Sequence, residues 1–278
     1  MPRSLFLLLA LLGLVAGAVP ATASPHWSWV EPLAQAHAHN DYEHDRPLHD
    51  ALDHGFTSVE ADIYLADGDL FVAHDPEDLD PARTLRSLYL EPLRQKVLRG
   101  GIYPGRRVDF QLLIDIKTEG ESTYAALDSV LRSPRYAFLW TSYRFGRVWR
   151  GPVAAVVSGN RPRETMEAQR SRVAFYDGRI ANQSDLGPGS DARLTPLVSD
   201  NWTTLFSWTG AGQMPAAERA SLREIVRTAH DAGQRVRFWA TPDVAGPERE
   251  AVWRELVAAD VDHINTDDLA GLQKFLCE

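Results

Sequence analysis

The sequence predicts an α/β protein built as a (β/α)8 TIM-type barrel, either regular or distorted. Short runs typical of strands alternate along the chain with segments of helical periodicity, an order that indicates parallel strands joined by crossover helices. Eight strand candidates can be counted, the number that a closed barrel needs. The 278 residues are 44% hydrophobic, which is enough for one large core. Because neither a linker nor a repeat interrupts the pattern, residues 24–278 are expected to form a single domain.

Strands are expected where apolar and polar residues alternate, or where short β-branched and aromatic runs stand between turn residues. The eight candidates are residues 33–38, 58–64, 110–116, 136–140, 153–158, 173–176, 236–240 and 263–266. A ninth candidate, 195–199, either replaces one of these or lies in a loop. The Asp67-Gly68 pair predicts a hairpin turn. Residues 178–190, rich in Gly, Asn, Ser and Asp, predict a long loop near the barrel mouth.

Helix signals fall between the strand candidates, where crossover helices are needed. Proline marks a first turn, and glycine or a Ser-Pro pair marks an end. The expected helices run from Pro92 to Gly100, from Glu121 to Ser133, from Pro215 to Gly233, from Pro247 onward, and over a final segment capped by Asp267.

The first 23 residues have the features of a secretory signal peptide. Arg3 supplies a positive start, residues 5–18 form an apolar run, and residues 21–23 are an Ala-x-Ala cleavage pattern. We expect cleavage after Ala23 and a secreted, extracytoplasmic protein. The alternative is a membrane anchor, but the run is short for a span of about 20 residues. No later segment is apolar enough to be a transmembrane segment of the mature chain.

Charge and cysteine content exclude several classes of protein. The formal net charge is −9, and loss of Arg3 with the signal peptide makes it −10. No block of consecutive basic residues is present, so nucleic acid is not an expected partner. Cys277 is the single cysteine, which excludes disulfides within the chain and thiolate zinc sites. The oligomeric state is not determined by these features.

Three carboxylates are expected to lie together at the strand ends. Side chains alternate along a strand, so residues 58–64 place Glu60 and Asp62 on one face, and the strand ending near Lys117 adds Asp115 to the same polar set. Carboxylates of this kind are ligands for Ca²⁺ or Mg²⁺ rather than for a thiol-binding metal. Three like charges inside a barrel are costly without a cation between them, so a divalent cation is the expected cofactor.

Two histidines and one lysine are candidates for acid-base and electrostatic roles. His39 follows the first strand and His74 follows the predicted hairpin. Imidazoles on either side of a phosphate can exchange proton donor and acceptor roles near neutral pH. Lys117, on the face of Asp115, either presents a positive charge to a phosphate or forms a buried ion pair with Asp115. Which histidine is the acid stays open.

Arg237 and Trp239 share one face of a later strand candidate, 236–240. With this parity they are candidates for substrate binding at the pocket wall. The alternative for Trp239 is a place in the core.

Two other kinds of protein share parts of this pattern. His37-Ala-His39 at the end of a first strand also suits a metal-dependent amidohydrolase, but that class needs further histidines and residues 75–229 contain none. His37 is therefore expected behind the site rather than on the metal. A non-catalytic lipid- or glycan-binding barrel is the second alternative. It would not need the acid, the base and all three carboxylates that this chain retains.

Several motifs together resemble the glycerophosphodiester phosphodiesterases and the wider phosphatidylinositol phospholipase C superfamily, most nearly the altered inheritance of mitochondria protein 6 branch. The motifs are Ala-His39-Asn40-Asp41-Tyr42, Gly55 to Asp62, the Asp67-Gly68 turn, Val72-Ala-His74-Asp75, Leu113 to Lys117, Val236 to Trp239 and Val261 to Asp267. The resemblance runs from about residue 33 to the end. It is strongest before Lys117 and thin between Ser142 and Thr228.

The resemblance implies a barrel that hydrolyses phosphodiesters or phospholipid head groups. His39 and His74 would match the paired acid and base, and Glu60, Asp62 and Asp115 the metal ligands. Glycerophosphodiester phosphodiesterases usually have Arg after the first His and a Pro-Glu-Asn-Thr run soon after; here Asn40 follows and the run is missing. Asn40 instead resembles the metal-binding Asn of eukaryotic phospholipases. The exact substrate, and whether water or a substrate hydroxyl attacks, stay open.

Overall fold

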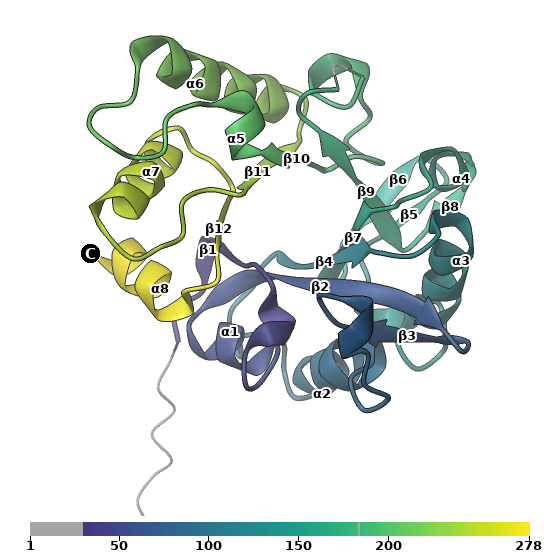
Figure 1. The fold of residues 1–278 in the computed structure, drawn as a ribbon. Helices are drawn as coiled ribbons and strands as arrows, with labels where there is room; N and C mark the ends of the chain where they lie inside the picture. Colours follow the sequence, from purple (N-terminus) through teal and green to yellow (C-terminus); the bar gives the residue numbers. More distant parts are fainter. Residues whose placement is uncertain (1–29, 183) are drawn as a thin grey trace, which may run out of the picture.

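The computed structural model describes residues 30–182 and 184–278, so the predicted signal peptide at 1–23 lies outside the described residues. Eight parallel strands form a closed barrel surrounded by helices (Figure 1). The barrel strands are β1 (Leu33–Ala38), β2 (Phe56–Ala66), β4 (Phe110–Ile116), β7 (Val153–Gly159), β9 (Ala174–Arg179), β10 (Leu197–Asn201), β11 (Arg235–Trp239) and β12 (His263–Thr266). This confirms the predicted (β/α)8 barrel.

The barrel closes because β1 pairs with strands from opposite ends of the sequence. It is parallel to β2 on one side and to β12 on the other, where His37 is paired with Asn265. The β1–β2 register shifts between Leu33 and His37, which is a local irregularity in the barrel wall. This register shift corresponds to the distorted form of the barrel, one of the two forms expected from the sequence.

Four short strands lie outside the barrel. They are β3 (Asp69–Val72), β5 (Ser142–Arg144), β6 (Arg147–Trp149) and β8 (Ser171–Arg172). Strand β3 extends β2 antiparallel across the predicted Asp67-Gly68 turn, which confirms that hairpin. Strands β5, β6 and β8 form a small separate antiparallel sheet.

The helices follow the barrel strands and cover them. They are α1 (His49–Asp53), α2 (Glu91–Leu98), α3 (Gly120–Leu131), α4 (Arg163–Ala168), α5 (Trp202–Leu205), α6 (Ala216–Asp231), α7 (Pro247–Ala258) and α8 (Leu269–Cys277). Proline stands at or just before the first turn of α2, α6 and α7, as predicted. After α6, Gly233 has a φ of 77°, a conformation that glycine adopts without strain.

Three sequence predictions about these elements were wrong. Residues 136–140 are not a strand: 137–139 form a 3₁₀ turn, and Trp140 makes a single bridge to Val153 while its indole donates to the Leu131 carbonyl. The eighth barrel strand is β10 instead, which confirms the alternative that the ninth candidate, 195–199, replaces one of the other eight. Asp268 rather than Asp267 caps α8, accepting a hydrogen bond from the Gly271 amide. The predicted loop also begins two residues later, because β9 continues to Arg179.

The outward and inward faces of the strands have different compositions. Val59, Ala61 and Ile63 of β2 belong to the large core between barrel and helices. Inside the barrel, Leu113, Val156, Phe175 and Leu197 form a small apolar cluster against which Tyr143 of β5 packs. The remaining inward positions carry polar side chains such as Glu60 and Arg237. The barrel interior therefore contains charged side chains of both signs.

Within residues 30–182 and 184–278, no helix is long and apolar enough to cross a bilayer.

Candidate active site

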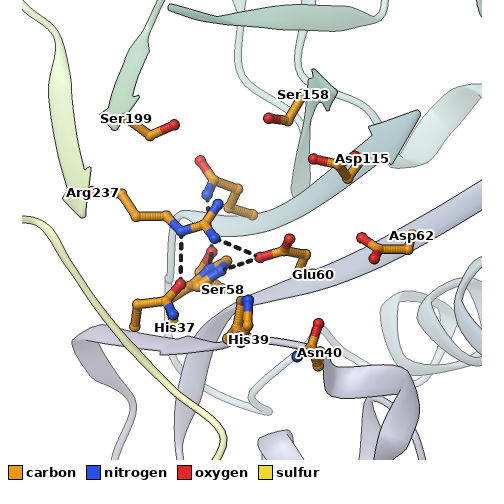
Figure 2. A network of polar contacts seen from close by, with 12 residues as sticks. His37, His39, Asn40, Ser58, Glu60, Asp62, Asp115, Ser158, Ser199 and Arg237 are labelled. Atoms are coloured by element: carbon orange, nitrogen blue, oxygen red, sulfur yellow. Dashed lines mark hydrogen bonds and ion pairs between the residues drawn. The ribbon is translucent and has the colours of Figure 1, made fainter. Parts of the chain in front are cut away.

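The three predicted carboxylates meet near the carboxyl ends of β2 and β4. Asp62 and Asp115 are direct register partners, and Glu60 lies two residues before Asp62 on the same face. One oxygen from each of the three lies within 4.8 Å of the others. Glu60 and Asp62 are buried, and Asp115 is partly buried. Figure 2 shows them facing Asn40, His39, Arg237, Ser158 and Ser199 across the barrel interior.

Two basic side chains are paired with these carboxylates. The Arg237 guanidinium lies 2.7 Å from Glu60 Oε2, and its Nε donates to Asn265 Oδ1 at 2.9 Å. Lys117 Nζ lies between Asp62, at 3.0 Å, and Asp115, at 3.2 Å. Arg237 was predicted to bind substrate. Its side chain is only 4% exposed, so these contacts favour a role in holding Glu60.

Buried charge shifts the pKa values of the cluster in different directions. Burial raises the pKa of Glu60, but the Arg237 charge and the hydrogen bond with His37 outweigh it, and the net pKa is lowered. Burial and then the Glu60 charge raise the pKa of Asp62 to about 6, against Lys117 and Tyr42. Burial also raises the pKa of Asp115. Three carboxylates face two cations, so one negative charge has no partner charge in the cluster.

Tyr42 connects Asn40 to the carboxylates. Its hydroxyl lies 2.6 Å from Asp62 Oδ2 and 2.9 Å from Asn40 Oδ1, and its one proton can be donated to only one of them. Asn40 has a φ of 46°, which turns the chain out of β1 into the 3₁₀ turn Asp41–Glu43. The other oxygen of Asp62, Oδ1, is buried and has no hydrogen-bond partner.

These features fit a divalent cation. The donor set is made of carboxylate and amide oxygens, which Mg²⁺ and Ca²⁺ prefer. The buried Asp62 Oδ1 needs a partner, because an unsatisfied buried polar atom is costly. The uncompensated negative charge needs one too. Glu60, Asp62, Asp115 and Asn40 are the residues that would hold the ion.

His39 is oriented by an acidic residue from the far end of the chain. Its Nδ1 lies 2.8 Å from Asp267 Oδ1, which leaves Nε2 available for proton transfer. Burial lowers the pKa of His39, but the hydrogen bond to Asp267 and the Glu60 charge outweigh it, so the net pKa is raised. Asp243 accepts from the Asp267 amide at 2.7 Å and so holds this loop in place.

His37 lies behind the site and cannot be a metal ligand alongside His39. It is fully buried, with Nδ1 2.7 Å from Ser58 Oγ and Nε2 3.2 Å from Glu60 Oε2. Burial and then the Arg237 charge lower the pKa of His37 to about 4, so the ring is neutral at physiological pH. Because both nitrogens are engaged, the amidohydrolase arrangement is disfavoured.

The side chains of His74 and Trp239 lie outside the hydrogen-bonded carboxylate cluster. The His74 imidazole is 58% exposed and lies 3.1 Å from Asp75, while its backbone carbonyl accepts from the Tyr64 hydroxyl at 2.8 Å. Tyr64 follows Glu60 and Asp62 on the same face of β2, so His74 is tied to that end of the strand. Trp239 is the last residue of β11 and is half-buried rather than part of the core.

Sequence reasoning missed three residues that shape this site. Tyr42 belongs to the His39–Tyr42 motif, but tyrosine is not a residue type that indicates metal binding. Asp267 was interpreted as a helix cap. Asp41 is buried and accepts from the Leu48 amide at 2.6 Å and from the Tyr89 hydroxyl at 2.9 Å, which anchors the turn that carries Asn40. A motif of consecutive polar residues at a strand end was the only available signal.

Comparison with known proteins agrees with this geometry. Residues 29–102 match the AIM6-like phosphodiesterase domain, and residues 235–270 match the glycerophosphoryl diester phosphodiesterase family. Altered inheritance of mitochondria protein 6 of Eremothecium gossypii is 31% identical over 274 residues, covering 88% of this chain and 70% of that protein. A homolog from Arthroderma benhamiae is 27% identical over 260 residues, covering 84% and 81%.

Among solved structures, a glycerophosphoryl diester phosphodiesterase from Parabacteroides distasonis shares the fold. The TM-score is 0.51 at 12% identity, with 89% of this chain and 87% of that chain covered. Fold and cluster therefore define the class, a phosphodiesterase-like (β/α)8 barrel. Within that class, the chain belongs to the altered inheritance of mitochondria protein 6 family.

Proposed function

We propose that the protein is a metal-dependent phosphodiesterase, a phosphoric diester hydrolase that acts on glycerophosphodiesters or phospholipid head groups. The observation that carries the proposal is the charge balance of the cluster. Glu60, Asp62 and Asp115 leave one negative charge uncompensated by Lys117 and Arg237. A divalent cation together with the single negative charge of a phosphodiester would make the site neutral.

The bound cation would polarise a phosphoryl oxygen and lower the pKa of an attacking hydroxyl. The chain's own residues then have distinct tasks. Lys117 presents a positive charge that is shared by Asp62 and Asp115 and would stabilise the negative charge that accumulates on the phosphoryl oxygens. Arg237 and His37 hold Glu60 in place from behind.

Proton transfer is assigned to His39 and His74. His39 Nε2 takes the proton of the attacking water or substrate hydroxyl as the new P–O bond forms, and Asp267 stabilises the resulting imidazolium. His74 gives a proton to the leaving alkoxide as the old P–O bond breaks. General acid-base catalysis of this kind is worth about 10²- to 10⁴-fold in rate. Trp239 is proposed as a wall for the alcohol portion of the substrate.

Export is part of the proposal. The positive start, the apolar run and the Ala-x-Ala pattern of residues 1–23 support it. Amino-terminal sequencing of protein recovered outside the cytoplasm is expected to begin at Ser24. Finding residues 1–23 intact on that protein would contradict the proposal and favour an anchor.

Activity is tested with a substrate panel and a chelator. The panel contains glycerophosphodiesters, lysophospholipids, phosphatidylinositol and bis(p-nitrophenyl) phosphate, each with EDTA and with Mg²⁺ or Ca²⁺ restored. We expect cleavage of at least one diester, loss with EDTA, and recovery with one of the ions. Binding of a lipid or glycan without cleavage of any diester, metal present, would favour the non-catalytic barrel instead.

A further inference from the structure

The β5–β6 hairpin carries an unusual group of exposed aromatic side chains. Phe145 is 86% exposed, Trp149 59% and Phe138, just before the hairpin, 45%. Within the described residues these are the exposed large aromatics, and Val148 beside them is exposed as well. A cluster of exposed apolar side chains on a soluble domain marks an interaction surface rather than a folding requirement.

The turn of this hairpin has a backbone conformation that is unfavourable for one of its two residues. Phe145 has a φ of 48° and Gly146 a φ of 82°, the pattern of a two-residue turn in which Asn-Gly or Asp-Gly is favoured. A bulky aromatic residue in the left-handed region is strained, and the ring gains nothing by folding because it lies in solvent. Its place at the tip is therefore explained by a contact outside the chain.

The same hairpin places like charges opposite each other. Arg144 of β5 is the register partner of Arg147 of β6, and cationic side chains directly opposite on a hairpin repel. Neither has a carboxylate within 4 Å in the part of the chain that the structure describes. In the sequence, residues 129–163 contain seven arginines and no Asp or Glu, although the whole chain has a net charge of −9. Four of the seven pair with carboxylates from outside this stretch, so the charge offered by the hairpin itself is that of Arg144 and Arg147; the four are Arg132, Arg135, Arg150 and Arg163. The arginines are spaced apart, so they form no consecutive basic block.

We propose that the β5–β6 hairpin is a docking site for an anionic lipid bilayer. Phe145 stands at the tip between Arg144 and Arg147, and the exposed Trp149 lies at the other end of β6. This combination suits insertion at the headgroup level, where aromatic rings lie among lipids and arginines contact the phosphates. A protein partner would instead need a broad complementary face. The remainder of the protein, which is acidic, would be repelled by anionic lipid. The hairpin would therefore set the orientation of the docked protein.

The orientation has a functional consequence. Tyr143 of β5 packs on the apolar cluster inside the barrel, and the hairpin leads into the first residues of β7. The hairpin therefore lies at the amino-terminal end of the barrel strands, whereas Asp62, Asp115 and Asn40 lie toward their carboxyl ends. Docked through the hairpin, the barrel would hold the carboxylate cluster away from that bilayer and open to soluble molecules.

Vesicle co-sedimentation of the full chain tests the proposal. Vesicles of phosphatidylcholine alone are compared with vesicles in which about one third of the lipid is phosphatidylglycerol. We expect binding to the anionic vesicles only, weakening as salt rises because screening reduces surface charge interactions. Arg144→Gln with Arg147→Gln should reduce the partition coefficient about 25-fold, on the scale of about fivefold for each arginine near the surface.

Phe145→Asn separates docking from folding. Asn-Gly suits the turn, so the variant should be at least as stable as the wild type in urea unfolding and yet lose most of its vesicle binding. Val244→Ser, which removes an equally exposed apolar side chain elsewhere, is the control and should bind as the wild type does. Hydrolysis of a soluble diester should be unchanged in all variants, so this test is independent of the proposed activity.

Three results would overturn the proposal. They are wild-type protein that ignores anionic vesicles, Phe145→Asn protein that binds them normally, and capture of a protein or single-stranded nucleic acid by the hairpin without any vesicle binding.

Discussion

Tyr42 is the residue whose contribution to the site can be isolated most directly. Its hydroxyl lies 2.6 Å from Asp62 Oδ2, and the ring is fully buried. Tyr42→Phe keeps the packing but removes the group that orients Asp62. We expect about a 10- to 100-fold loss of Mg²⁺ or Ca²⁺ affinity, the scale of lost partners behind a metal ligand. Isothermal titration calorimetry measures it without any substrate.

The control for Tyr42→Phe is Tyr124→Phe. The Tyr124 hydroxyl is also engaged, donating to Gln169 at 2.8 Å, but it lies outside the carboxylate cluster. Both variants should lose about 1 kcal/mol of unfolding free energy. If they also have the same metal affinity, Tyr42 has no special role at the site.

Metal binding and proton transfer should be separable by single substitutions. Asp62→Asn keeps the shape and removes one charge, so divalent affinity should fall and excess metal should restore part of the activity. His74→Gln leaves the carboxylates untouched. It should bind metal like the wild type while kcat falls about 10²-fold or more.

The leaving group tests the direction of proton transfer. If His74 is the acid, the defect of His74→Gln should shrink with p-nitrophenolate, which leaves without a proton. A defect of constant size across substrates would make His74 the base. Identical metal titrations and identical leaving-group dependence for Asp62→Asn and His74→Gln would show that the proposed division of roles is wrong.

At the scale of elements, the end of β7 sets the position of Asp115. Gly159 has a φ of 66°, and a Cβ there would lie 2.4 Å from Asp115 Oδ1 and from the Ile116 carbonyl oxygen. Gly159→Ala should therefore lower the free energy of unfolding by more than the roughly 1 kcal/mol of a left-handed alanine. It should also weaken metal binding.

Gly68→Ala is the matched control for Gly159→Ala. Gly68 has a φ of 81°, but nothing lies within 4 Å of an added Cβ. Urea unfolding of both variants separates the backbone penalty from the clash. Equal losses of stability would mean that Asp115 and Ile116 shift at little cost to make room for the added methyl group.

Periodicity predicted the elements well where a strand has two different faces. Strands β1, β4 and β12 have the predicted bounds because their apolar residues alternate with polar ones or form a short buried run. Residues 136–140 were wrongly predicted because Tyr136 and Trp140 are buried on either side of the 3₁₀ turn 137–139, and their composition does not distinguish such a turn from a strand. The contact between His39 and Asp267 spans 228 positions and depends on barrel closure, so no local pattern reveals it.

The candidate site was predictable to a similar degree. Alternation along β2 and β4 placed Glu60, Asp62 and Asp115 together, and the structure brings them within reach of one ion. The pairing of Arg237 with Glu60 was not predicted, because it joins strands on different sides of the barrel interior. Parity shows which side chains point inward, but not which of them meet.

At the scale of the whole molecule, the barrel interior places buried basic groups below the carboxylates. His263 lies on β12 with 2% exposure, and its Nε2 is 3.2 Å from Arg235. The other ring nitrogen has no hydrogen-bond partner. Burial and then the positive charge of Arg235 lower the pKa of His263 well below its usual value near 6.5. The folded barrel therefore keeps this ring neutral under conditions where an unfolded chain protonates it.

This difference predicts how stability depends on pH. Above about pH 6.5 the ring is neutral in both states, and its contribution to stability is fully present. As the pH falls below that value, only the unfolded chain binds the proton, so the free energy of unfolding decreases by up to about 1.4 kcal/mol per pH unit for this one group. Urea unfolding at several pH values between 7.5 and 5.0, at constant ionic strength, measures the slope. In His263→Gln the slope of unfolding free energy against pH should be smaller by the contribution of about one bound proton, because glutamine does not titrate. A histidine ring signal of the folded wild type that titrates near pH 6.5 and disappears in His263→Gln would contradict the prediction, since it would show that the barrel admits the charged form.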